Sequence, residues 1–233
     1  MSALLLVLAT CSTPKQADSG SKEIEVLLPD VSVATFVTGI DNPYSPMPVG
    51  ATWTFEAEGE DGSERIEVSV LAETRVINGV VATVVRDTAY LDERVAEDTR
   101  DWFAQDSVGN VWYLGEDTCE YEEEACVDTG GSWEWGVDGA LPGIVMPASP
   151  TVDGQPYYQE YKVGEAEDVG EVVALGESVT VPAGTFDDCV KTHETSTLEL
   201  DATEYKYFCR GVGLALVEEP DIQEKLVATS ETP

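Results

Sequence analysis

Basic side chains are scarce in this sequence, which has 12 lysines and arginines against 46 aspartates and glutamates and a formal net charge of -34. So acidic a surface repels the phosphates of DNA and RNA and the headgroups of anionic lipids, which excludes nucleic-acid partners and direct adsorption to such membranes. Two causes fit the acidity. One is a saline habitat that selects a soluble surface, and the other is binding of divalent cations by clustered carboxylates.

Histidine is almost missing as well, since His193 is the single example. A Ser-His-Asp triad would have to use it, and a zinc site would have few other nitrogen ligands. The sequence also lacks a G-x-S-x-G elbow, an H-E-x-x-H motif, a Walker loop and a dinucleotide-binding fingerprint. We therefore assign no catalytic residue, leave enzymatic activity uncertain with a non-enzymatic role favoured, and expect His193 to make a structural hydrogen bond within a strand.

No hydrophobic run is long enough to span a bilayer, because the apolar stretch at residues 3–9 is far shorter than about 20 residues. It is typical of the central part of an export signal. The run ends at Cys11 in a pattern that resembles the lipidation site of bacterial lipoproteins, although Thr10 replaces the usual small residue and no basic residue precedes the run. We expect a signal-like segment at residues 1–11 with lipidation at Cys11 and a flexible tether at residues 12–40. The protein would lie outside the cytoplasm, either anchored by the lipid or secreted with Cys11 unused.

The remaining four cysteines predict two disulfides, since an even number in an exported chain is usually paired. Spacing favours the bridges Cys119–Cys126 and Cys189–Cys209. The second bridge fits a hairpin in which Cys189 faces Cys209, Lys191 faces Tyr207 and His193 faces Tyr205. A zinc site made of the four cysteines is the rival hypothesis, but it lacks a C-x-x-C pair.

Apolar residues alternate with polar ones through most of the chain, which predicts strands with one buried face. Trp53, Phe55 and Ala57 share one such face. With 42% hydrophobic residues the chain has enough apolar side chains for a core. We predict an all-β fold, an antiparallel meander that forms a curved sheet, half-barrel or sandwich with little helix. A single domain would cover residues 41–220, followed by a C-terminal tail at residues 221–233.

The Asn78-Gly79 pair predicts a tight hairpin turn. Pairing outward from this turn puts Ile77 opposite Val80. The same register, continued without interruption, puts Ile66 opposite Leu91, Val68 opposite Ala89, and Val70 opposite Asp87.

The densest acidic stretch surrounds the first predicted disulfide, which would hold several carboxylates together at a hairpin tip. A bound cation would relieve their repulsion, so Ca²⁺ is a possible cofactor, and a hydrated acidic loop without metal is the alternative. The candidate ligands are Glu116, Asp117, Glu120, Glu122, Glu123, Glu124 and Asp128.

Trp133 and Trp135 are spaced to lie on the same face of a strand. If that face meets solvent, the two indoles form a platform for a sugar or another flat ligand. The alternative is that both cap one edge of the core. The other tryptophans fit the core better.

Eight short blocks of the sequence stand out: DNPY at 41–44, DWFAQD at 101–106, GNVWYLGED at 109–117, GSWE at 131–134, GVDGA at 136–140, YYQEY at 157–161, VPAGTF at 181–186 and GVGL at 211–214. Together they resemble an uncharacterised family of bacterial exported proteins, many of them lipoproteins. The end of the chain is also similar to TapB-like β domains and, more remotely, to LolA/LppX-type lipoprotein carriers. The resemblance covers about residues 41–219 and implies one domain with an open antiparallel half-barrel, but no activity.

Three functions follow as hypotheses from different classes. The first is a non-enzymatic binding or structural domain at the cell envelope, with a glycan, a polymer or an envelope protein as partner. The second is a lipid or lipoprotein carrier with a concave apolar sheet. The third is a hydrolase that uses two carboxylates, such as a glycosidase, although the sequence cannot choose the pair. The lining of the largest concavity distinguishes the three.

Overall fold

The computed structural model describes residues 25–59, 62–152, 154–199 and 202–231. As predicted, these residues form an antiparallel β structure, with one 3-10 turn, Val31–Val33. Within the described ranges, no helix has the length and apolar character needed to cross a membrane.

The strands are β1 (Phe36–Val37), β2 (Thr52–Gly59), β3 (Gly62–Ile77), β4 (Val80–Leu91), β5 (Arg94–Asp106), β6 (Val111–Glu122), β7 (Ala125–Asp128), β8 (Trp133–Glu134), β9 (Leu141–Met146), β10 (Tyr157–Tyr158), β11 (Glu160–Tyr161), β12 (Asp168–Val181), β13 (Gly184–Ser196), β14 (Thr203–Cys209), β15 (Gly213–Glu218) and β16 (Gln223–Thr229).

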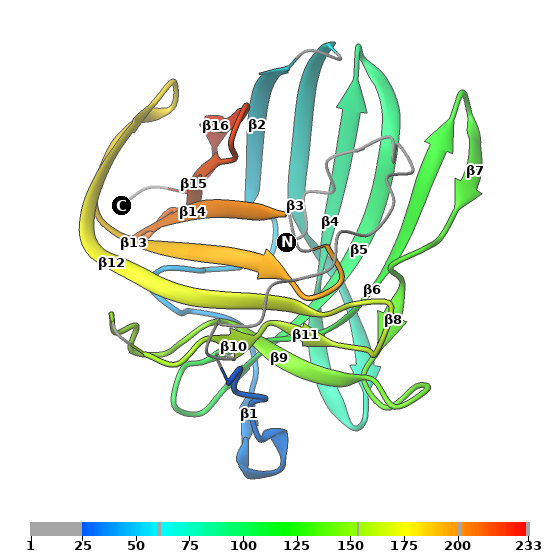
Figure 1. The fold of residues 1–233 in the computed structure, drawn as a ribbon, viewed down its shortest axis with the longest axis vertical. Coiled ribbons are helices and arrows are strands. Elements are labelled where there is room, and N and C mark those ends of the chain that lie inside the picture. The colour runs from blue at the N-terminus through cyan, green and yellow to red at the C-terminus, as the bar shows by residue number, and fades with distance from the viewer. Residues whose placement is uncertain (1–24, 60–61, 153, 200–201, 232–233) are drawn as a thin grey trace, which may run out of the picture.

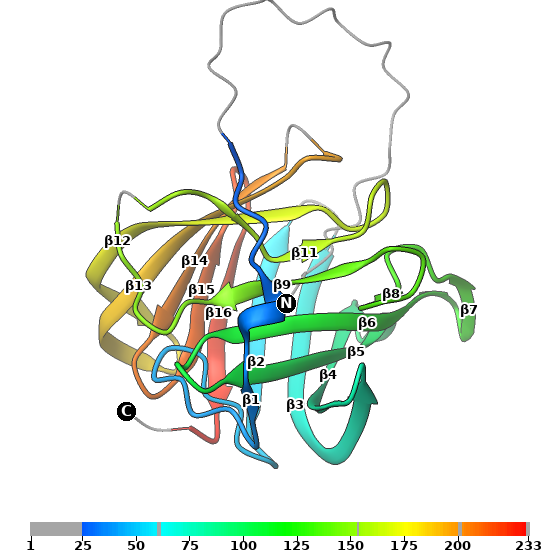
Figure 2. The same cartoon turned by 90° about the horizontal axis from the view of Figure 1, so that it is seen from below.

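One curved sheet, nearly closed into a barrel, contains thirteen of these strands in the order β10-β12-β13-β14-β15-β16-β2-β3-β4-β5-β6-β9-β11, while β1 pairs with β5, and β7 and β8 pair with β6. Figures 1 and 2 show β12–β14 curving across one side while β2–β6 form the other. The two ends of this order, β10 and β11, are neighbours in the chain. We call residues 157–161, which contain both, the closing segment.

The closing segment joins the sheet ends through short ladders. Tyr157 and Tyr158 pair with β12, while Glu160 and Tyr161 pair with β9. Gln159 passes between them and is buried. A Cβ atom at Gly143 of β9 would lie 2.3 Å from the carbonyl oxygen of Tyr158, so only glycine allows this close approach.

The sheet buries side chains on both faces. On the inner face, a core cluster includes Phe55, Ile66, Phe103 and Leu226, in line with the alternation seen in the sequence. On the outer face of β4–β6, a smaller cluster around Trp102 and other apolar residues is covered by the segment that runs through the 3-10 turn to β1. The chain therefore needs its N-terminal described segment to shield apolar surface outside the sheet.

The register of the β3–β4 hairpin differs from the predicted one beyond the first pairs. Ile77 does lie opposite Val80, but a bulge between Val70 and Thr74 adds two residues to β3. As a result the predicted partners beyond it were wrong: Ile66 pairs with Ala89, Val68 with Asp87 and Val70 with Val85. Because the shift is even, every side chain keeps the face that the pattern predicted.

The segments next to the predicted domain take part in the sheet. Residues 25–40, placed in the tether by sequence, include a bridge of Leu27 to Tyr157 and the pairing of β1 with β5. Residues 12–24 and the signal-like segment with Cys11 lie outside the described residues. Within 221–233, the predicted tail, β16 pairs with both β15 and β2 and thus links the last strands to the first.

Both predicted disulfides are present. Cys119 pairs with Cys126 and Cys189 with Cys209. The ladder of β13 and β14 also has the predicted register, with Cys189 opposite Cys209 and His193 opposite Tyr205.

Candidate functional site

A bulge in β6 turns two polar side chains into the interior. Asp101 and Phe103 on β5 pair with Glu116 and Tyr113, so β6 contains one more residue than β5 between these pairs. Gly115 has φ +138, and a Cβ there would lie 2.3 Å from the carbonyl oxygen of Trp133. Strict alternation would send residues 113 and 116 to opposite faces, but the bulge brings both to the inner face.

The residues gathered there form what we call the Tyr113 cluster: Asp101, Tyr113, Glu116, Trp133 and Glu160. The Tyr113 hydroxyl lies 2.6 Å from Oδ1 of Asp101 and 2.9 Å from Oε2 of Glu116. Trp133 Nε1 donates to Oε2 of Glu160 at 2.8 Å. All five side chains are buried, with Asp101 only 2% exposed.

Aromatic packing fixes the cluster in place. The Tyr113 ring stacks on Phe103 with centroids 4.8 Å apart, and Trp133 meets it edge-on at 5.4 Å. These contacts hold the phenol so that its hydroxyl reaches both carboxyl groups.

Burial dominates the protonation of the cluster. It raises the pKa of Asp101, although the hydrogen bond from Tyr113 partly opposes this. It raises the pKa of Glu116 well above its usual range, with the charges of Glu160 and Asp101 acting in the same direction. Burial and then the charge of Asp168 raise the pKa of Glu160 to about 8. Since the pKa of Glu160 is about 8, its neutral acid is favoured at neutral pH.

The cluster is one part of a ring of ionisable groups on the inner face, which we call the interior belt. Electrostatic interactions connect its members in sequence around the sheet, so each carboxylate adds to the cost of charging the next. The belt consists of Glu64, Asp87, Asp101, Glu116, Glu160, Asp168, Glu194, Glu204, Lys206 and Glu224.

Lys206 is the cation of the belt. Its ammonium is 2.8 Å from Glu194 and 2.8 Å from Glu204. Burial raises the pKa of Glu194, but Lys206 outweighs this and holds it below the usual value. At Glu204 burial prevails over Lys206, so that pKa is raised. The belt thus has far more carboxyl groups than positive charge to balance them.

Two polar atoms of the interior have no hydrogen-bond partner in the described structure: Oδ2 of Asp101 and the hydroxyl of Tyr157. Tyr157 belongs to the closing segment, and the charge of Glu194 contributes to the raised pKa of its phenol, after burial. A buried oxygen without a donor costs roughly 1–3 kcal/mol, more when it is charged. Such atoms mark a place that a hydrogen-bonding ligand or water would satisfy.

Two concavities lie apart from the residues of the Tyr113 cluster. A small interior cavity of about 10 Å³ is lined by Asp87, Lys206 and Glu224 together with apolar residues such as Phe55. A surface groove of about 560 Å³ lies beside the β15–β16 turn, and its polar lining includes Glu56, Glu58, Glu219, Asp221 and Lys225. Burial and then Glu204 raise the pKa of Glu219 to about 7. Neither lining offers a wide apolar wall or exposed aromatic rings.

The predicted calcium ligands are separated by the strand geometry. Glu116 points into the interior, whereas its neighbour Asp117 is exposed. Glu122, Glu123, Glu124 and Asp128 are exposed at the β6–β7 hairpin, and Glu120 is partly buried next to Cys119. Among the described residues, no group of three or more histidine, cysteine, aspartate or glutamate side chains is arranged to hold a metal ion.

The two tryptophans of the predicted platform also separate. Trp133 is 3% exposed within the inner core, so its indole does not face solvent. Trp135 is partly buried and packs against both core clusters, 6.3 Å from the Phe36 ring. Their positions correspond to the alternative in which the pair caps the core.

His193 lies mid-strand in β13, as expected. Its Nε2 is 2.8 Å from the Thr203 hydroxyl, and its ring stacks on Tyr205 with centroids 4.9 Å apart. This is the structural hydrogen bond that the sequence predicted.

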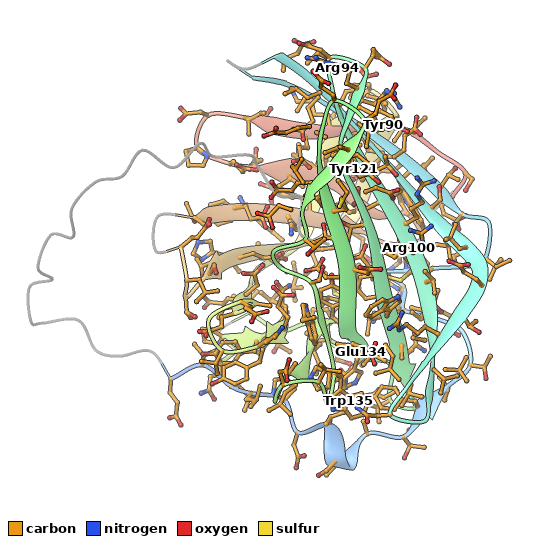
Figure 3. All side chains as sticks on the ribbon, turned by 90° about the vertical axis from the view of Figure 1, so that its right-hand side faces the viewer. Tyr90, Arg94, Arg100, Tyr121, Glu134 and Trp135 are labelled. Carbon is orange, nitrogen blue, oxygen red and sulfur yellow. A yellow bond between two sulfur atoms is a disulfide. The ribbon has the colours of Figure 1, made fainter. Side chains whose placement is uncertain are left out.

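The outer face of β3–β5 contains four of the six arginines, and Figure 3 shows Arg100 there with Tyr90. Carboxylates neutralise several of them: Arg86 pairs with Asp98 at 2.7 Å, and Arg75 pairs with Glu134. The face is therefore a mixed-charge surface, not a basic one. The four arginines are Arg65, Arg75, Arg86 and Arg100.

Asp101, Tyr113 and Glu160 were not predicted as site residues from the sequence. A signal was present, because Asp101 precedes Phe103 by two residues in a strand pattern and must share its buried face. Glu160 gave no comparable signal, since its position depends on the closing of the sheet.

Comparisons with known proteins assign this chain to no family. No family model matches the chain, and no curated protein matches it. Among solved structures, it is similar to a chain described as "a putative lipoprotein from Parabacteroides distasonis", with 13% identity, a TM-score of 0.44, and coverage of 81% of this chain and 99% of that one. The family resemblance drawn from the sequence blocks stays a prediction.

Proposed function

We propose that this protein is an extracytoplasmic binding domain that takes up an organic cation in its interior, at the Tyr113 cluster. The observation that carries the proposal is Oδ2 of Asp101, a buried carboxylate oxygen without a donor inside a ring of further carboxyl groups. A positively charged hydrogen-bond donor satisfies that atom and offsets the repulsion around it.

An organic cation fits better than a metal ion. The described carboxylates are not grouped as metal ligands. The inner face instead combines carboxyl groups with aromatic rings and aliphatic side chains of the core. The rings of Tyr113 and Trp133 favour a cation near their faces, and the apolar core side chains favour an alkyl chain attached to it.

The other two hypotheses receive less support. A lipid carrier needs a continuous apolar inner wall, whereas this inner face carries the interior belt. A glycosidase needs two carboxyl groups on either side of the glycosidic bond, but Asp101 and Glu116 are joined to each other through the Tyr113 hydroxyl. A glycan platform of two tryptophans would need Trp133 at the surface.

The proposed location rests on the two disulfides, because such bridges form and persist in oxidising compartments. Anchoring through a lipid on Cys11 remains a proposal. In bacterial cells that express the full chain, we expect the protein in the membrane fraction and the Cys11→Ser variant in the soluble fraction. Equal distribution of both would argue against the anchor.

Thermal unfolding with alkylammonium ions tests the binding function. We expect butylammonium chloride to raise Tm beyond sodium chloride at matched ionic strength, by about 5–10 °C at 100 times Kd. Asp101→Asn should abolish most of the difference, while Glu124→Asn, at the exposed hairpin tip, should retain it. If butylammonium and sodium act alike on the wild type, the interior is not a cation site.

A further inference from the structure

The Tyr113 oxygen makes two hydrogen-bond contacts with carboxyl groups. The phenol supplies the proton for one contact, and two ionised carboxylates have no proton for the other. A phenol has one proton to donate, yet its oxygen is within hydrogen-bond distance of both Asp101 and Glu116. The two carboxyl groups also lie directly opposite each other in the ladder of β5 and β6. Both contacts are satisfied when one carboxyl group is protonated and donates to the phenol oxygen.

The geometry indicates which carboxyl group holds the proton. The shorter contact, 2.6 Å, joins the Tyr113 hydroxyl to Asp101 and fits a phenol that donates to a charged carboxylate. The contact of 2.9 Å with Glu116 then has the carboxylic acid of Glu116 as donor. Burial and the charge of Glu160 raise the pKa of Glu116 well above that of a free glutamate, which agrees with this assignment.

We propose that a primary ammonium ligand binds at Asp101 in exchange for the proton of Glu116, with Tyr113 as the link between the two sites. The proposal rests on the cation-binding function above and adds the class of ligand and its coupling to pH. The ammonium donates one N–H to Oδ2 of Asp101 and a second to the carboxylate that Glu116 becomes. The proton of Glu116 passes to solvent, so one positive charge replaces another and no redox partner is needed.

The surroundings favour a one-for-one exchange. The groups that act on Glu116 and Asp101 are Glu160 on β11, Tyr113 on β6, Asp87 on β4 and Glu97 on β5. All are acids. A cation bound beside them favours the ionised form of Glu116, and the carboxylate that results accepts a stronger, charge-assisted N–H bond than the neutral acid does. A quaternary ammonium has no N–H and gains nothing from the second carboxylate. The site should therefore discriminate primary from quaternary ammonium ions.

Calorimetric titration of the full chain with butylammonium tests the exchange. Titration at pH 7 in phosphate and in HEPES, which differ in ionisation enthalpy and contain no primary amine, should show release of about one proton for each bound ion. Trimethylbutylammonium should bind more weakly and release less. Glu116→Gln, which mimics the protonated acid, should still bind butylammonium but release almost no proton, while Glu124→Gln should behave like the wild type. Binding without proton release in the wild type overturns the exchange and leaves the cation site intact.

A measurement without ligand separates the two proposals. Infrared spectra at pH 7 should contain a carboxylic acid C=O band that is lost in Glu116→Gln and shifted in Tyr113→Phe, because Tyr113→Phe removes the hydroxyl that accepts the hydrogen bond from Glu116. If the wild type and Glu116→Gln do not differ in this region, Glu116 holds no proton and the exchange is wrong, whatever butylammonium does. If the band is present but butylammonium fails to bind, the cation site itself is wrong.

Discussion

The indole of Trp133 donates a hydrogen bond of 2.8 Å to Glu160 and so ties the closing segment to the interior. Glu160 is 5% exposed, and its pKa is raised to about 8 by burial and then by the charge of Asp168. The closing segment thus contains a carboxyl group that prefers to be neutral. Its protonation state affects how firmly the sheet is closed.

The first prediction concerns pH. A folded-state pKa above the unfolded value means that the native state binds more protons, so the stabilisation is complete below about pH 4.5 and is lost as pH rises through 8. For Glu160 alone the loss is roughly 5 kcal/mol at most. The raised pKa values of Asp87, Glu116 and Glu224 act in the same direction. We expect the free energy of unfolding in urea to fall from pH 5 to pH 9.

Glu160→Gln provides the matched variant, because the amide resembles the protonated acid. It should match the wild type near pH 5 and exceed its stability at pH 9. Glu124→Gln, an exposed glutamate, should leave the pH profile unchanged. A wild-type stability that rises or stays level across this window contradicts the prediction.

Much of the fold was visible in the sequence because strand alternation is local. The faces of β2 and the register of β13–β14 followed from apolar spacing and from two cysteines that must meet. The bulge of β3 was not visible, since nothing in its residues signals where the ladder slips. The face of Glu116 was hidden for the same reason, because the bulge at Gly115 reverses the alternation there.

The closing segment and the interior belt were beyond the sequence for a different reason. Glu160, Asp101 and Glu194 are separated by many residues in the chain and meet only when the sheet curves round. With 46 acidic residues, the pattern could not tell interior carboxylates from those on the surface.

The second prediction concerns the closing of the sheet. Gly143→Ala places a Cβ 2.3 Å from the Tyr158 carbonyl oxygen, so the closing segment must move. Overpacking of this kind costs about 1–3 kcal/mol. We expect a lower Tm and faster hydrogen exchange at residues 157–161.

Gly154→Ala serves as the control, since its Cβ would meet Thr151 at an ordinary 3.4 Å. It should leave both Tm and exchange close to the wild type. If Gly143→Ala protects residues 157–161 as well as the wild type does, the short ladders are not the weak point of the sheet.

The third prediction compares the two disulfides. The Cys189–Cys209 bridge closes the longer loop, with a sequence separation of 20 against 7 for Cys119–Cys126. The loop entropy lost from the unfolded chain then stabilises the fold by about 3 kcal/mol for Cys189–Cys209 and by about 2 kcal/mol for Cys119–Cys126. Cys189 and Cys209 are also fully buried, whereas Cys126 is exposed. Replacing both cysteines of a bridge by alanine should therefore lower the urea midpoint more for Cys189–Cys209. An equal or reversed order would show that the hairpin bridge does not stabilise the core.

The fourth prediction tests calcium at the β6–β7 hairpin. Glu122, Glu123 and Glu124 are exposed and close together in the chain beyond the Cys119–Cys126 bridge, where mutual repulsion is relieved by either salt or a bound cation. A Ca²⁺ site at this hairpin would raise Tm above that in sodium chloride of equal ionic strength, and EDTA would reverse the rise. Replacing the three glutamates by glutamine should then remove the response, whereas Asp101→Asn should not, because Asp101 lies in the interior.

The expected outcome is different, because Glu122, Glu123 and Glu124 are exposed and are not grouped as metal ligands. We therefore expect Ca²⁺ and sodium to act alike at matched ionic strength. A response specific to Ca²⁺ and lost with the three glutamates would instead assign part of the acidity to a metal site.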